Sequence, residues 1–204
     1  MTRTWFGVVG LAVMFALSVA VWDLAPDSMP IHWSAGRPDG YASKSVGLLL
    51  LPCIALGQFV VMLLVGYRRD AQDAELAEVQ TLLVLLLLGF HVALVSNALG
   101  RPVDPAILIA GLLAWLGTRL RSLRPNMLIG VRTKWTFESR VAWERSNRLA
   151  SWLMLSLSPI ALLLALFRVR FATEAVIAAI VTATIAVVIY SWMVWKADPD
   201  RSHT

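Results

Sequence analysis

The chain alternates long apolar runs with short polar connections. Six runs approach the ~20 residues that a helix needs to cross the hydrocarbon of a bilayer. The fourth is the weakest, because it is short and begins beside two prolines. The runs are Thr4 to Trp22, Val46 to Gly66, Val79 to Ala98, Val103 to Leu120, Leu149 to Phe167, and Ala172 to Trp195. This pattern predicts an all-α polytopic membrane bundle with six transmembrane helices, forming one membrane domain over residues 1–204.

Composition and charge distribution agree with a membrane protein. Hydrophobic residues make up 58% of the chain and charged residues 15%, whereas about a quarter of a typical soluble domain is charged. With the N-terminus inside, 13 of the 18 basic residues fall on the inner side of the predicted bundle. Because Lys and Arg concentrate in cytoplasmic connections, we expect both termini in the cytoplasm. This topology explains most of the net charge of +5 without a nucleic-acid partner.

The first long connection, residues 23–45, is called the outer segment below. It contains prolines and glycines that stop helices and permit turns, and "RPDGY" at 37–41 predicts a tight turn in which Gly40 is able to take positive φ. Its side chains suit ligand contact or anchoring at the headgroup layer. A metal site is a further alternative, although the spacing matches no ligand pattern. The candidate outward-facing residues are His32, Trp33, Asp39, Tyr41 and Lys44.

The second long connection, residues 121–148, is called the inner segment. It opens with a basic, aromatic stretch and continues as a short predicted helix, with Thr136 as its N-cap, that runs into the fifth span. Arg140 and Glu144 stand four residues apart and can pair on that helix. Attraction to anionic lipid and docking of a cytoplasmic partner are both compatible with this composition.

Three polar side chains lie within the predicted spans, namely Gln58, His91 and Asn97. Polar groups in hydrocarbon need partners, and we expect interhelical hydrogen bonds, with a contact between His91 and Gln58 as one option. If the three side chains instead line a shared pocket, the chain would be a small-molecule or lipid transporter. No catalytic signature is found, and no cofactor or metal is predicted. A membrane enzyme that uses His32 and the nearby carboxylates is a third hypothesis.

The two connecting segments together carry a family resemblance. "MPIHWSAGRPDGYASK" at 29–44 resembles the signature of an uncharacterised domain at the N-terminal end of SdpI-like membrane proteins, and residues 1–66 would form that domain. "RPNMLIGVRTKWTFESRVAWERSNR" at 124–148 resembles the SdpI motif, and residues 79–204 would form the SdpI-like region. Two positions depart from the expected signatures, with Ser34 in place of Asn and Lys134 in place of Pro.

The resemblance implies a function on each side of the membrane. The best-known member of the family confers immunity against a secreted peptide toxin and holds a transcriptional repressor at the membrane. By resemblance, the outer segment would meet a toxin and the inner segment a soluble regulator. The candidate residues for the inner partner are Arg124, Asn126, Gly130, Arg132, Thr133, Trp135 and Trp143.

Overall fold

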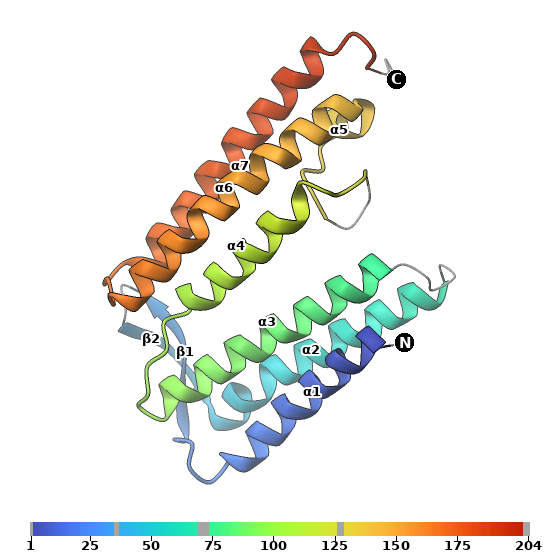
Figure 1. Ribbon diagram of the computed structural model, residues 1–204. Helices are drawn as coiled ribbons and strands as arrows, with labels where there is room; N and C mark the ends of the chain where they lie inside the picture. Colours follow the sequence, from blue (N-terminus) through green and yellow to red (C-terminus); the bar gives the residue numbers. More distant parts are fainter. Residues whose placement is uncertain (1, 35–36, 69–73, 126–128, 202–204) are drawn as a thin grey trace. The chain divides into compact units, whose positions relative to one another are not determined.

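The computed structural model describes residues 2–34, 37–68, 74–125 and 129–201. The chain divides into two compact units, Met1–Pro105 and Ala106–Thr204. Each unit is built mainly from helices (Figure 1). Whether the chain behaves as one membrane domain stays a prediction.

The first unit contains α1 (Thr2–Ala20), β1 (Ser28–Ser34), β2 (Arg37–Ser43), α2 (Lys44–Arg68) and α3 (Ala74–Ala98). The three helices pack side by side, and the two strands form an antiparallel hairpin at the end of the bundle where α1 ends and α2 begins (Figure 1). Strand β2 runs directly into α2 without a linker. Two apolar clusters hold the unit, one among the helices and one beneath the hairpin.

The second unit contains α4 (Ala106–Leu120), α5 (Lys134–Glu138), α6 (Arg140–Leu166) and α7 (Ala172–Ala197). Helix α6 lies between α4 and α7 and contacts both. Two serines of α6 donate to carbonyl oxygens of α4: Ser151 Oγ to Gly117 O at 2.5 Å and Ser158 Oγ to Ala110 O at 2.9 Å. Such bonds replace water as the partner of a hydroxyl in an apolar bundle.

Each of the six predicted apolar runs forms a helix. Four helices are long and apolar enough to cross a membrane, over Lys44–Leu64, Val79–Ala98, Arg140–Leu166 and Ala172–Ala197. Two further apolar helices are shorter, Trp5–Ala20 and Ala106–Leu120. The chain is therefore a mostly helical, multi-pass membrane protein, while six crossings and the cytoplasmic placement of both termini stay predictions.

The outer segment differs from its prediction. Residues 37–43 form strand β2, so the tight turn expected at "RPDGY" is wrong. Gly40 does not take a positive φ; among the residues that the structure describes, the glycines that do are Gly100 and Gly130. The register instead places Gly40 opposite His32, next to an irregularity in the ladder. Pairing between strands, which a local pattern does not report, has overridden the turn propensity of Pro38 and Gly40.

Candidate functional site

The hairpin joins two of the predicted outer residues. His32 Nδ1 lies 2.6 Å from Asp39 Oδ1, and both side chains are exposed. A carboxylate oxygen accepts, so this contact assigns a proton to Nδ1 and leaves Nε2 of a neutral His32 as a hydrogen-bond acceptor. Gly40 makes the pairing possible, since a Cβ at that position would fall 2.9 Å from His32 Cβ.

The other predicted outer residues have different settings. Tyr41 is 59% exposed, and Trp33 is partly buried. Lys44 closes the base of the hairpin: its Nζ lies 3.2 Å from Asp27 Oδ1, and its backbone N–H donates to Asp27 O at 2.9 Å. The hairpin thus exposes the hydrogen-bonded His32–Asp39 pair and the ring of Tyr41. Lys44 also stabilises the base of the hairpin.

A buried methionine anchors the hairpin on the helices. Met29 of β1 is fully buried and packs in a cluster with Val21, Ala25, Leu48 and Val95. Gly47 of α2 permits this seat, because a Cβ there would fall 2.7 Å from Met29 Sδ. The hairpin is therefore packed against the helices of the first unit.

The inner segment is built around a short capped helix. Thr133 is the N-cap of α5, and Thr133 and Thr136 form a reciprocal capping box. Thr136 was expected to be the N-cap and instead occupies the third helical position, where its Oγ1 also donates to Val131 O at 2.7 Å. Ser139 ends α5 and caps α6 by accepting from Ala142 N at 2.9 Å. The predicted helix that runs into the fifth span is confirmed, and it begins at Arg140.

Both tryptophans of the inner motif donate hydrogen bonds within the second unit. Trp135 Nε1 donates to Ser191 Oγ of α7 at 2.6 Å. Trp143 is fully buried, and its Nε1 donates to Leu123 O at 2.9 Å. Gly130 has φ of +126°, and a Cβ there would fall 2.9 Å from Trp143 Cη2. The inner segment is therefore held in its conformation by internal contacts of Gly130, Trp135 and Trp143.

Two further buried polar residues complete this network, and the sequence reading missed both. Asn147 Oδ1 accepts from Val131 N at 3.0 Å. Asp198, which follows α7, accepts a short hydrogen bond from Ser139 Oγ. That bond is the main reason why the pKa of Asp198 lies below its ordinary value, with Asp200 N–H and two arginines adding to it. A polar residue two turns into a helix was the available signal for Asn147.

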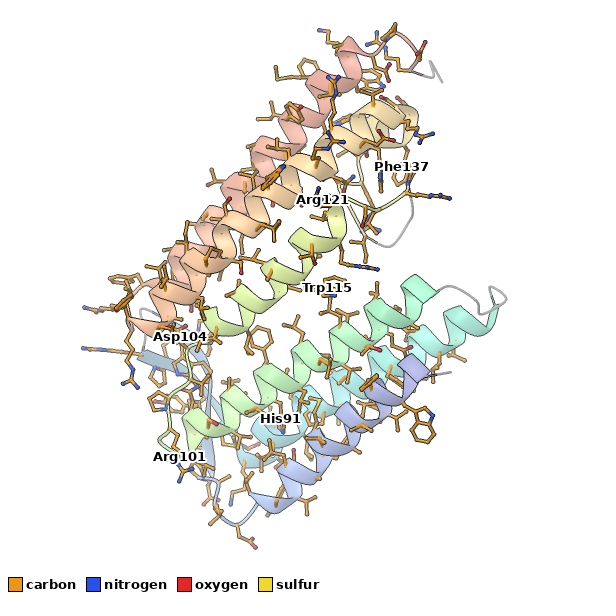
Figure 2. The ribbon with its side chains drawn as sticks, viewed as in Figure 1. His91, Arg101, Asp104, Trp115, Arg121 and Phe137 are labelled. Atoms are coloured by element: carbon orange, nitrogen blue, oxygen red, sulfur yellow. The ribbon has the colours of Figure 1, made fainter. Side chains whose placement is uncertain are left out.

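The exposed part of the inner motif is basic. Arg124 and Arg132 are exposed, and Asn126 lies outside the described residues. Arg140 Nε contacts Glu144 Oε1 at 2.9 Å, which confirms the predicted pair. Phe137 is 46% exposed and lies 5.7 Å from the Trp143 ring, measured between centroids (Figure 2). The two arginines and Phe137 therefore form the exposed part of the inner segment.

The intramembrane polar residues have separate environments. His91 Nε2 lies 3.0 Å from Ser18 Oγ of α1, so the contact suggested with Gln58 is replaced by one with Ser18. The side-chain amide atoms of Gln58 are buried with no hydrogen-bond partner among the described residues. Asn97 Nδ2 donates to Ala93 O at 2.7 Å and to Val103 O at 3.0 Å, which fixes the chain as it leaves α3. None of these contacts joins Gln58, His91 and Asn97 to one another.

Within the described residues, no group of three or more His, Cys, Asp or Glu side chains could hold a metal ion. Cys53 is exposed on α2.

Comparison with known proteins finds similarity in two separate regions of the chain. A domain of unknown function (DUF1648) matches residues 9–56. The SdpI/YfhL protein family matches residues 122–194. The immunity protein SdpI of Bacillus subtilis (strain 168) is 25% identical over 158 residues, which cover 74% of this chain and 75% of that protein. The chain is an SdpI-like protein with an N-terminal DUF1648 domain.

The matched regions map onto the two structural units of this SdpI-like chain. The DUF1648 match spans most of α1, the hairpin and the first half of α2. The SdpI/YfhL match spans the inner segment, α5, α6 and most of α7. No solved structure matches the chain.

Proposed function

We propose that this protein is an immunity protein of the cytoplasmic membrane that protects the cell against a membrane-active peptide. The observation that carries the proposal is the similarity to the immunity protein SdpI, which extends over three quarters of both chains. The absence of a three-residue metal cluster in the described regions gives no support to the enzyme hypothesis. The separate environments of Gln58, His91 and Asn97 give none to the transporter hypothesis.

We place the hairpin outside the cell and the inner segment in the cytoplasm, with six crossings. The distribution of basic residues supports this orientation. Helix α4 has 15 residues, and at 1.5 Å per residue it is about 22 Å long, against about 30 Å of hydrocarbon. Arg119 and Arg121 at its inner end have side chains long enough to extend to the headgroups, which makes a short crossing tolerable.

The hairpin is the proposed recognition element for the peptide. Tyr41 and Ile31 are exposed apolar groups on adjacent strands. The His32–Asp39 pair adds acceptors that can orient a donor of the peptide, such as an ammonium or amide group. Binding at this face would hold the peptide at the membrane surface and prevent its insertion or self-assembly.

The inner segment is the proposed contact for a cytoplasmic regulator. Arg124, Arg132 and Phe137 are exposed on a rigid, internally bonded support. A basic surface with an aromatic group suits an acidic protein partner, such as a soluble transcriptional repressor held at the membrane. Signalling would require two states of the second unit.

Protection assays with matched variants test the proposal. Cells that express the protein, at confirmed membrane levels, are challenged with a membrane-active peptide and compared with cells that lack it. Protection should be lost in Tyr41→Ala and Asp39→Ala and kept in Phe137→Ala, which removes an exposed aromatic ring from the inner segment. Equal killing with and without the protein, across a panel of secreted bacterial peptides, would refute immunity. Loss of protection in Phe137→Ala alone would refute the assignment of the hairpin.

A further inference from the structure

A proline inside α2 leaves one backbone carbonyl without its helical partner. In an α-helix the N–H of residue i donates to the carbonyl of residue i−4, and proline has no N–H. Pro52 lies within α2, so the carbonyl of Leu48 loses its donor. Leu48 is fully buried, and an unpaired carbonyl in an apolar bundle is costly.

A serine from another helix supplies the missing donor. Ser18 Oγ of α1 lies 2.7 Å from Leu48 O and 3.1 Å from Met14 O, and Ser18 is fully buried. A hydroxyl has one proton, and Met14 O already receives the backbone N–H of Ser18 within α1. The Ser18 proton therefore belongs to Leu48 O.

His91 of α3 completes this arrangement. His91 is labelled in Figure 2, and its Nε2 lies 3.0 Å from Ser18 Oγ. Because the serine proton is used for Leu48 O, the contact requires Nε2–H of His91 to donate to Ser18 Oγ. His91 is fully buried, and its Nδ1 has no hydrogen-bond partner in the described part of the chain. One chain of hydrogen bonds thus links α3 to α1 and α1 to the break in α2.

The bonded carbonyl lies on the part of α2 that carries the hairpin. Strand β2 ends at Ser43 and α2 begins at Lys44, so the eight residues 44–51 before Pro52 connect the hairpin rigidly to the proline. Leu48 belongs to this short arm, and its side chain also packs in the cluster that holds Met29 of β1. Leu48 therefore accepts the hydrogen bond through its carbonyl and contributes its side chain to the cluster that holds the hairpin.

We infer that Ser18 and His91 are positioning residues for the hairpin: they fix the outer arm of α2 at the Pro52 break and thereby hold the hairpin in the orientation that its ligand requires. Neither residue touches the ligand. The inference rests on the proposed function only for what the hairpin binds; the positioning itself is measured without any peptide.

The test uses the fact that Pro52 is the reason why the Leu48 carbonyl lacks its helical donor. Ser18→Ala removes the donor and should release the arm, raising the equilibrium constant for the displaced arrangement about 5- to 150-fold. Pro52→Ala restores a backbone N–H for Leu48 O, so Ser18→Ala combined with Pro52→Ala should return the arm to its parental position. If Ser18→Ala acted only by changing the packing volume, Pro52→Ala would not restore the position of the arm.

The measurement is a distance between two spin labels across the break. Labels at Arg37→Cys on β2 and Val61→Cys on α2, in a Cys53→Ala background, report the hairpin against the far part of the helix. The full-length protein is studied in lipid nanodiscs. We expect a narrow distance distribution in the parent, a broad one in Ser18→Ala, and a narrow one again in the Ser18→Ala, Pro52→Ala protein.

His91 provides the second pair of variants. His91→Gln keeps a side-chain N–H that can donate to Ser18 Oγ and should retain a narrow distribution, whereas His91→Leu removes the donor and should broaden it. Protection in cells should follow the same order in both series. An unchanged distribution in Ser18→Ala, or failure of Pro52→Ala to restore it, overturns the inference. Absence of protection by the parent, with the expected distances, overturns only the proposed function.

Discussion

The buried amide of Asn147 makes a strong prediction about the inner segment. Its Oδ1 accepts the N–H of Val131 at 3.0 Å, and its Nδ2 donates to Trp143 O at 2.9 Å. The second bond is dispensable, because Trp143 O also receives the backbone N–H of residue 147 within α6. The first is not, because Val131 N makes no other hydrogen bond within the described part of this region. Asn147→Ala should therefore act mainly through Val131.

The magnitude follows from the single donor left unpaired. Val131 is half-buried, so the cost of leaving its N–H unpaired has as its upper range the about 1–3 kcal/mol of a fully buried group, which corresponds to about a 5- to 150-fold increase in local opening. The cavity left by the amide adds to this cost. Because α6 and α7 pack through other contacts, including Ala150 with Val187, the bundle itself should remain folded.

Hydrogen–deuterium exchange with mass spectrometry provides the assay. In the Asn147→Ala protein, peptides that contain Val131 should exchange faster, while peptides from the interior of α7 should not change. Arg148→Ala is the matched control, since it alters the adjacent, exposed position of the same helix. Unchanged exchange around Val131 in Asn147→Ala would show that the amide does not hold the segment, and the account of the inner network would be wrong.

Three further predictions concern the hairpin and the inner end of the second unit. Gly47→Ala would place a Cβ 2.7 Å from Met29 Sδ, so a protease should cleave the hairpin faster than in the lipid-side control Gly57→Ala. Equal cleavage rates in the two variants would contradict the packing of Met29 against Gly47. The pKa of Asp198 is lowered, chiefly by Ser139. Ionised Asp198 therefore stabilises the fold at pH values above the ordinary pKa of an aspartate, and this stabilisation is lost as the pH falls below about 4. Below that pH, the melting temperature of Asp198→Asn should fall less than that of the parent. Parallel plots of melting temperature against pH for the two proteins would exclude this role. Trp135→Phe removes the donor to the serine of α7 and should lower the free energy of unfolding by the worth of one hydrogen bond, about 1 kcal/mol, with a corresponding fall in the melting temperature. An unchanged melting temperature would mean that the bond adds nothing.

The sequence predicted the helices well because their signal is local. A run of apolar residues long enough to span hydrocarbon has few alternatives to a helix, and even the short run ending at Leu120 is helical. The hairpin escaped prediction for the opposite reason. Its strands are defined by pairing and by the burial of Met29, both of which depend on residues distant in sequence.

The side-chain roles in the inner segment were equally dependent on tertiary structure. Trp135 and Trp143 look alike in sequence as aromatic groups of a basic connection, and both turn out to donate inside the unit. The role of Pro52 was accessible in part: a proline within a span predicts an orphaned carbonyl four residues earlier. That Ser18 would satisfy it could not be read from sequence, because the helix packing selects the donor.

The division of the chain at Pro105 has a consequence for how such proteins diversify. Each unit has apolar clusters of its own, and the two matched families fall on different units. Recombination within the connection at 99–105 could therefore exchange one half for another without rebuilding either interior. Under the proposed function, peptide recognition and regulator binding would then be inherited as separable modules, acquired one at a time.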